Sequence, residues 1–339
     1  MKKILALTLC VLVFAGILSG CSINEKSDKI EIVTTIFPEY DWVREILGEN
    51  NDRVNITMLI DSGADLHSYQ PTADDIVKVA TCDLFIYVGG ESDAWVADVL
   101  KTAKNPDMIV VNLLDVLGDK VKEEEVKEGM EAEDEHDHDH DEEEEHDHDH
   151  EHEHHHDEDE PEFDEHVWLS LKNAVDLTGF IAEKIKTLDP DHADYYAANT
   201  SAYVAKLQAL DAKYAAAVNE GTVKTLLFGD RFPFRYLVDD YGLDYFAAFV
   251  GCSAESEASF ETIVFLSNKV DELHLKAIMQ IESADGKIAN TIKNQTQTKD
   301  QTVLTLDSMQ SVTAKDVKNG TTYLGVMERN LEVLKEALK

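Results

Sequence analysis

Histidine and carboxylate residues make up nearly all of one internal segment, from Glu133 to Glu160. Neutral imidazole is a common ligand for zinc-like divalent cations, and neighbouring carboxylates raise the local concentration of those cations. We therefore interpret this segment as a low-selectivity collector of metal, in preference to an acidic linker whose histidines are incidental. Ten of the fourteen histidines of the chain belong to it: His136, His138, His140, His146, His148, His150, His152, His154, His155 and His156.

The same segment contains no apolar side chain, so it cannot bury a face against a core. It is predicted to be a disordered loop over about residues 122–163. It also supplies much of the net charge of −39. A surface this acidic repels nucleic acid and attracts cations, which excludes a nucleic-acid partner.

The first 20 residues have the form of a lipoprotein signal peptide. Lys2 and Lys3 precede an apolar run that is too short to span a membrane, and Leu18-Ser19-Gly20-Cys21 resembles the bacterial lipobox. The pattern predicts diacylation of Cys21, a tether over residues 21–28, and an extracytoplasmic protein anchored by lipid to the bacterial cell membrane. An ordinary secretory signal with a chance cysteine is the alternative.

Two cysteines remain once Cys10 and Cys21 are assigned to the signal and the anchor. Cys82 lies among apolar residues, and Cys252 follows a strand-like run. They are far apart in the sequence, and no Cys-x-x-Cys spacing is present. We interpret both as free, structural thiols, not as a disulfide.

Strand-like runs alternate with helical patterns on both sides of the histidine-rich segment, which predicts parallel sheets covered by helices. The fold class is therefore α/β, with an N-terminal lobe over residues 29–189 and a C-terminal lobe over residues 221–339. The predicted strands lie at 30–35, 54–60, 84–88 and 108–111 before the segment, and at 225–228, 244–250, 277–281 and 302–306 after it.

A helical pattern over residues 190–220 joins the two predicted lobes. A helix of roughly 28 residues is about 42 Å long, which is enough to run along both lobes. Ligands of open α/β sheets bind at the carboxyl ends of the strands. The sequence therefore predicts a metal site in the cleft between the lobes.

Three metal-competent side chains follow predicted strands or the histidine-rich segment. His67 lies in the loop after the second strand, His166 lies where ordered structure resumes, and Asp307 follows the last strand. A loop histidine by itself is more often a surface residue, but three such side chains facing one cleft are a stronger signal of a metal site.

Several motifs together resemble the zinc- and manganese-binding lipoproteins of bacterial ABC importers, from about Cys21 to Lys339. They are the lipobox, G-A-D-L-H-S-Y-Q-P-T at 63–72, the histidine-rich loop, D-E-H-V-W-L at 164–169, Y-G-L at 241–243 and the terminal Y-L-x-V-M-x-x-N-L-x-x-L-x-x-A-L. The resemblance implies two α/β lobes bridged by a rigid long helix with the metal held between them. It also implies His67, His166 and Asp307 as ligands and an ABC permease as partner.

One ligand implied by the resemblance does not carry over. Arg231 stands where the family has His or Glu before Y-G-L, and a guanidinium cannot bind a cation. Its neighbour Asp230 is the substitute that we expect. Glu255, Glu257, water or a histidine of the loop are the alternatives, and Arg231 would then neutralise nearby acidic groups.

The sequence thus predicts a monomeric binding protein that captures Zn²⁺ and delivers it to an ABC permease. The ten-histidine loop favours zinc over Mn²⁺ or Fe²⁺, because imidazole-rich sites hold zinc more tightly than manganese. A surface metal buffer or adhesin is the alternative, and a secreted zinc hydrolase is a weaker one. We expect no enzyme, since His-Glu-x-x-His, Gly-x-Ser-x-Gly and a Cys/His nucleophile pair are all absent from the sequence.

Overall fold

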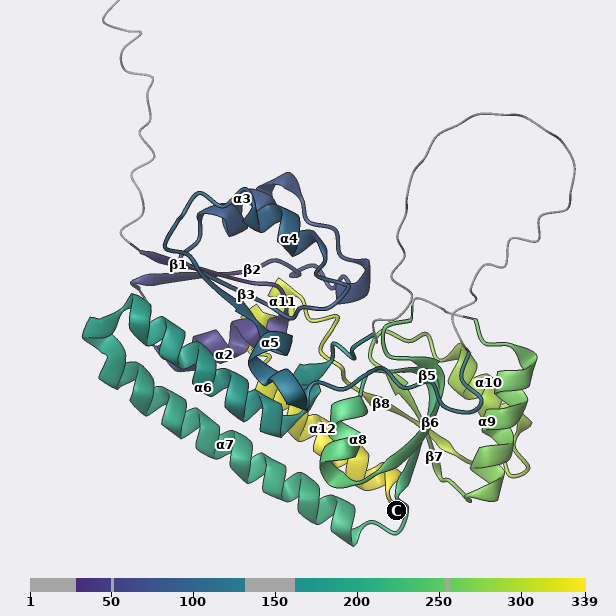
Figure 1. The fold of residues 1–339 in the computed structure, drawn as a ribbon. Coiled ribbons are helices and arrows are strands. Elements are labelled where there is room, and N and C mark those ends of the chain that lie inside the picture. The colour runs from purple at the N-terminus through teal and green to yellow at the C-terminus, as the bar shows by residue number, and fades with distance from the viewer. Residues whose placement is uncertain (1–28, 50–51, 132–161, 254–256) are drawn as a thin grey trace, which may run out of the picture.

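Two four-stranded parallel sheets, each with helices on both faces, form the two lobes of the computed structural model (Figure 1). The structure describes residues 29–49, 52–131, 162–253 and 257–339. The signal peptide, the tether with Cys21, the ten histidines of the collector segment, and Glu255 lie outside these described residues. Within them, no helix combines the length and the apolar character that a membrane span requires.

The sheet of the first lobe has the strand order β2-β1-β3-β4. Most residues of its strands are apolar, as expected for parallel strands that are covered on both faces. Helices α3 and α4 lie over one face, and α2, α5 and α6 lie over the other (Figure 1). The elements are β1 (Ile30–Thr34), α2 (Phe37–Leu47), β2 (Val54–Met58), α3 (Ala73–Thr81), β3 (Leu84–Tyr87), α4 (Trp95–Leu100), β4 (Ile109–Asn112), α5 (Leu113–Leu117) and α6 (Leu171–Leu188).

The sheet of the second lobe has the order β6-β5-β7-β8. Helices α9 and α10 cover its outer face, and α8 and α12 cover the face toward the first lobe (Figure 1). Its elements are β5 (Thr225–Phe232), α8 (Arg235–Tyr241), β6 (Asp244–Val250), α9 (Phe260–Glu272), β7 (Ala277–Ile281), α10 (Lys287–Gln295), β8 (Thr302–Leu306), α11 (Ala314–Lys318) and α12 (Tyr323–Ala337). The short helix α11 is not among the elements predicted from the sequence.

Strand β5 extends four residues beyond the predicted end at Phe228. Its pairing with β6 shifts register between Phe228 and Arg231. Gly229 lies at this irregularity, where a Cβ atom would come within 2.5 Å of Ala289 Cα in α10. The close approach of that helix requires glycine, and the irregular end of β5 directs Asp230 and Arg231 toward the cleft region.

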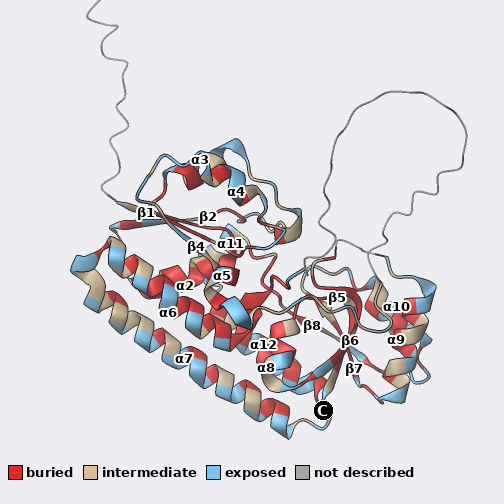
Figure 2. Ribbon diagram, in the orientation of Figure 1, coloured by how far each residue is buried: buried red, intermediate tan, exposed pale blue. Residues whose placement is uncertain are grey.

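The long connecting helix is present as α7 (Ala193–Glu220), after a 3₁₀ turn at Pro190–His192. It packs against α6 and α2 of the first lobe and against α12 and α8 farther along. Figure 2 shows it buried along the side that faces the lobes and exposed along the other. The predicted fold class, two parallel-sheet α/β lobes with one long helix between them, is confirmed.

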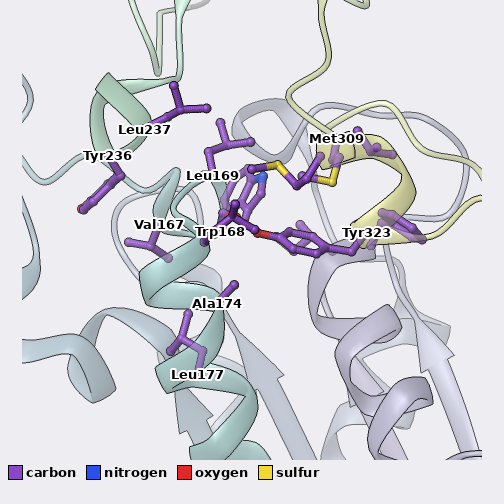
Figure 3. Packing of buried hydrophobic residues seen from close by; sticks show 14 of the residues in the cluster. Val167, Trp168, Leu169, Ala174, Leu177, Tyr236, Leu237, Met309 and Tyr323 are labelled. Carbon is purple, nitrogen blue, oxygen red and sulfur yellow. The ribbon is translucent and has the colours of Figure 1, made fainter. Parts of the chain in front are cut away.

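One apolar core is shared by both lobes. It includes Trp42 and Trp168 from the first lobe and Tyr323 at the start of α12, all fully buried. The Trp168 indole donates a hydrogen bond to the Ser308 carbonyl (2.9 Å), and the Tyr323 hydroxyl donates to the Trp168 carbonyl (2.7 Å). Figure 3 shows Met309 packed beside this pair. A continuous core of this kind fixes how the lobes sit relative to each other.

The disordered loop predicted over about residues 122–163 is ordered at both of its described ends. Residues 122–131 lie against the second lobe, where the Glu131 amide donates to the Ala248 carbonyl (2.9 Å), and residues 162–163 pair with residues 123–124. The cause is that β6 is an edge strand with unpaired backbone groups, and Glu131 pairs with it.

Candidate metal centre

His67 reaches the centre from a 3₁₀ turn at Leu66–Ser68, which follows β2. Asp65 caps this turn, with its carboxylate accepting a hydrogen bond from the His67 amide (3.1 Å). The imidazole Nδ1 lies 2.8 Å from Ser92 Oγ and 3.5 Å from Glu165 Oε2. These partners leave Nε2 directed into the cleft.

His166 is fully buried at the start of the 3₁₀ turn Val167–Leu169. Asp164 accepts hydrogen bonds from the His166 amide (2.9 Å) and lies 3.1 Å from the imidazole Nδ1. A carboxylate on one ring nitrogen fixes the ring and makes the other nitrogen a better metal ligand. Nε2 of His166 is therefore the ring nitrogen that could bind a metal ion.

The Nε2 atoms of the two imidazoles meet, with His67 Nε2 3.1 Å from His166 Nε2. Burial, followed by the charges of His166 and Arg231, lowers the pKa of His67 to about 3. His67 is therefore neutral at neutral pH, which is the form that binds a metal. The structure thus brings together two of the residues that the sequence singled out, from segments 99 positions apart.

A third ligand-type side chain joins this pair from the second lobe. Cys252 follows β6, and the ligand atoms of His67, His166 and Cys252 all lie within 4.8 Å of one another. Burial, followed by the charges of Glu124, Asp164 and Glu165, raises the pKa of the Cys252 thiol. Sequence reasoning treated this cysteine as structural. Its position directly after a strand, at the edge where the cleft was predicted, is the signal that could have identified it.

Asp230 and Asp307, both predicted as ligands, do not join the cluster in the described part of the chain. The Asp230 carboxylate accepts hydrogen bonds from the amides of Ile281 (2.9 Å) and Arg231 (2.8 Å), so it ties β5 to β7. The Asp307 carboxylate accepts from the Met309 amide (2.8 Å). Burial, together with the charge of Glu282, raises the pKa of Asp307 to about 6.

The loop after β8 turns sharply because Met309 adopts a left-handed backbone conformation, with φ of 64°. Beyond this turn, Gln310 lies beside His166, whereas Asp307 does not join the cluster of described ligand-type residues. With its amide oriented to satisfy both neighbours, Gln310 donates to Asp65 Oδ1 (2.8 Å), and its oxygen lies 3.1 Å from His166 Nε2. The residue of the loop after β8 that reaches the centre is therefore Gln310.

Arg231 occupies the position where the resemblance implied a ligand, and it forms a bridge between the lobes. Its guanidinium donates to Asp65 Oδ2 (2.5 Å) and to the Ser253 carbonyl (3.2 Å). Burial alone raises the pKa of Asp65, but the Arg231 charge and hydrogen bond outweigh this and lower it. The Asp65–Arg231 pair is thus ionised, as required by the prediction that Arg231 neutralises a nearby acidic group.

Two cavities open onto the cluster. One, of about 490 Å³, is lined by Asp65, His67, Asp230, Arg231 and Glu257 among others. The other, of about 260 Å³, contains His67 and Cys252 and is rimmed by four glutamates, Glu91, Glu124, Glu162 and Glu165. The second cavity is strongly acidic and therefore suits a cation.

A two-lobed α/β fold whose ligand atoms converge where the lobes meet is that of a solute-binding protein. The chain belongs to the ZnuA family, since the family described as zinc-uptake complex component A, periplasmic, matches residues 32–337. The zinc-binding lipoprotein AdcA of Streptococcus pneumoniae (strain TIGR4) is 33% identical over 339 residues, which cover 99% of this chain and 61% of AdcA. This chain thus spans about three fifths of the length of that relative.

Other relatives match along nearly their whole length. The high-affinity zinc uptake system protein ZnuA of Bacillus subtilis is 31% identical, over 94% of this chain and 90% of its own. The Zn(II)-bound ZnuA-like domain of S. pneumoniae AdcA superposes with a TM-score of 0.68 at 28% identity, over 91% of this chain and 99% of that one. The metal-dependent lipoprotein YcdH of B. subtilis gives a TM-score of 0.70 at 26% identity, with the same coverage.

Proposed function

We propose that this protein captures Zn²⁺ outside the cytoplasm and delivers it to an ABC permease, without catalysing a reaction. The observation that carries the proposal is the convergence of His67 Nε2 and His166 Nε2 at 3.1 Å in the inter-lobe cleft. Relatives named as zinc-binding or zinc-uptake proteins support the same cargo. His67 and His166 are the ligands that we propose first.

Each of these imidazoles is held by a partner on its other nitrogen, Ser92 for His67 and Asp164 for His166. Such partners orient the ring before the metal arrives, so little ordering is required on binding. A hydrolytic zinc site would in addition need an open coordination position and a general base near it. The arrangement fits capture and release of an ion.

Cys21 and the histidine-rich segment complete the proposal. Diacylated Cys21 would hold a monomer at the outer face of the cell membrane, near the permease. The ten histidines would raise the supply of zinc beside the acidic cavity that contains Glu162, the first described residue after the segment. Manganese is the alternative cargo, and imidazole-rich ligands favour zinc over it.

The test uses a chain in which a short Gly/Ser linker replaces residues 132–161, so that only the cleft site is measured. Zinc affinity is determined by competition with a chromophoric chelator for His67→Asn, His166→Asn and the matched control His274→Asn. His274 is exposed and has a φ of 54°, which asparagine tolerates. Each ligand variant should bind at least ~10-fold more weakly, since second-shell losses alone cost about 10–100-fold. Unchanged affinity in both would refute the cleft site.

Delivery is tested in cells. A host strain that lacks this protein should recover growth on zinc-limited medium with the wild-type chain, but not with the His67→Asn/His166→Asn double variant. Cys21→Ala should move the protein from the membrane fraction to the soluble one. Full growth with the double variant would contradict zinc delivery.

A further inference from the structure

The Cys252 sulfur lies close to the distance from both imidazoles that a shared zinc ion requires. In a tetrahedral site with Zn–N of about 2.0–2.1 Å and Zn–S of about 2.3 Å, ligand atoms stand about 3.3–3.6 Å apart. The two Nε2 atoms are 3.1 Å apart, and the Cys252 sulfur lies within 4.8 Å of a ring nitrogen of each histidine. A movement of about 1 Å by one side chain would therefore complete a three-ligand site.

The backbone beside Cys252 is built to approach His166. A Cβ atom at Gly251 would lie 2.9 Å from the Phe232 carbonyl oxygen and 3.0 Å from His166 Cε1, so only glycine lets this turn pack on the imidazole. The Cys252 amide donates to Glu124 Oε1 (3.1 Å), which holds the turn in place. The position of the thiol next to His166 is thus enforced by its neighbours.

A buried carboxylate beside the cluster has an oxygen that no described residue satisfies. The Glu165 side chain is 3% exposed, and its Oε1 accepts from the Ser92 amide. Its Oε2 has no hydrogen-bond partner and faces His67 Nδ1 at 3.5 Å, in the cavity that also contains Cys252. An unpaired buried carboxylate oxygen is costly, and a cation in this cavity would compensate for it.

The other candidates from the second lobe are engaged elsewhere. Arg231 is tied to Asp65 and the Ser253 carbonyl, and the carboxylates of Asp230 and Asp307 accept backbone hydrogen bonds outside the cluster. Within the described ranges, Cys252 is the second-lobe member of the group of possible ligands.

We propose that Cys252 is a zinc ligand, so that two imidazoles of the first lobe and a sulfur of the second hold the ion between them. This inference rests on the proposed function. On binding, a Zn–S bond replaces the S–H bond and the proton leaves to solvent. A thiolate is a soft ligand that suits zinc and disfavours manganese, so Cys252 also determines which metal is carried.

The test uses Co²⁺ as a spectroscopic probe, because a thiolate bound to Co²⁺ gives a sulfur-to-metal charge-transfer absorption that imidazoles and carboxylates do not. All variants carry Cys10→Ser and Cys21→Ser, which leaves Cys82 and Cys252 as their cysteines. The reference chain should show the absorption, Cys252→Ser should lose it, and the matched control Cys82→Ser should keep it. Cys82 is buried in the first lobe, in a different apolar cluster.

Zinc and manganese affinities of the same variants give a second measurement. Cys252→Ser should weaken zinc binding at least ~10-fold and manganese binding far less, so the ratio of the two affinities should fall. The absence of the charge-transfer absorption from the reference chain overturns the proposal even if Cys252→Ser fails to fold. Wild-type zinc affinity in Cys252→Ser also overturns it.

The two proposals fail differently. If His67→Asn and His166→Asn weaken zinc binding but Cys252→Ser does not, the cleft site stands and the sulfur ligand is wrong. If neither histidine variant weakens binding, the cleft site itself is wrong.

Discussion

The ion pair between Asp65 and Arg231 should stabilise the contact between the lobes. The two atoms, Asp65 Oδ2 and Arg231 Nη2, are 2.5 Å apart, and the side chains are 23% and 14% exposed. Hydrogen bonds to charged groups contribute about 1.5–3 kcal/mol when buried, whereas exposed ion pairs contribute about 0–1 kcal/mol. Partial exposure leaves some screening by solvent, so we expect a coupling energy of about 1–2 kcal/mol.

The measurement is a double-mutant cycle with Asp65→Asn, Arg231→Gln and the double variant, each unfolded by urea in the metal-free form. Asp65→Asn also alters the cap on the His67 amide, but this effect is present in both arms of the cycle and cancels. Each single variant should lose about 1–2 kcal/mol, or roughly 2 °C in melting temperature per kcal/mol. The coupling should decrease at high salt.

Additive effects of the two substitutions, within about 0.3–0.5 kcal/mol, would refute this reasoning. They would mean that solvent screens the pair completely and that the shared core alone holds the lobes together.

Three further predictions concern packing, protonation and metal. Gly251→Ala should weaken zinc binding and destabilise the fold, because its Cβ would meet the Phe232 carbonyl and His166. Gly179→Ala, which has open space around it in α6, should instead stabilise the fold by about 0.5–1 kcal/mol. Chelator competition measures the zinc affinity of both variants, and urea unfolding measures their stability. Burial raises the pKa of Asp41 from 3.8 to about 6, so its contribution to stability is complete below pH 3.8 and is lost as pH rises through 6. The stability of the wild type relative to Asp41→Asn should fall by about 2.4 kcal/mol between pH 4 and 7 in urea unfolding. Zinc at 100 times its Kd should raise the free energy of unfolding by about 2.7 kcal/mol in the wild type and much less in His67→Asn, as calorimetry will show.

The outcomes that contradict these predictions are specific. Equal zinc affinity in Gly251→Ala and Gly179→Ala would show that the turn before Cys252 tolerates a side chain. A pH-independent difference between wild type and Asp41→Asn would show that this carboxyl is not perturbed. Equal zinc stabilisation in His67→Asn and wild type would place the stabilising ion elsewhere.

The strands of both sheets could be located from the sequence because their apolar runs are local and their boundaries are marked by turn residues. Strands β6, β7 and β8 have the predicted bounds. The predicted strand β5 ends too early, at Phe228, where Gly229 and two charged residues follow in the sequence. The strand continues because Arg231 and Phe232 pair with Phe249 and Val250 of β6, and this pairing depends on a distant segment.

Some residues of the candidate site could likewise be predicted from the sequence, and others could not. His67 and His166 could be selected from the sequence because each lies in a short motif, G-A-D-L-H-S-Y-Q-P-T after a predicted strand or D-E-H-V-W-L where ordered structure resumes. Asp307 was selected because it follows a strand, but its carboxylate accepts a hydrogen bond from the Met309 amide and does not join the cluster of described ligand-type residues. The direction of a side chain after a strand depends on such loop geometry.

The sequence by itself determined the α/β alternation, the connecting helix and the two histidines, because each depends on periodicity or on contacts a few residues apart. Only the tertiary structure decided that Cys252 meets His67 and His166, and that Arg231 pairs with Asp65. These side chains are 86 to 185 positions apart, and no local pattern encodes how the loops of two different sheets meet. That meeting is set by the order of the strands and by the core that both lobes share, which is a property of the whole chain.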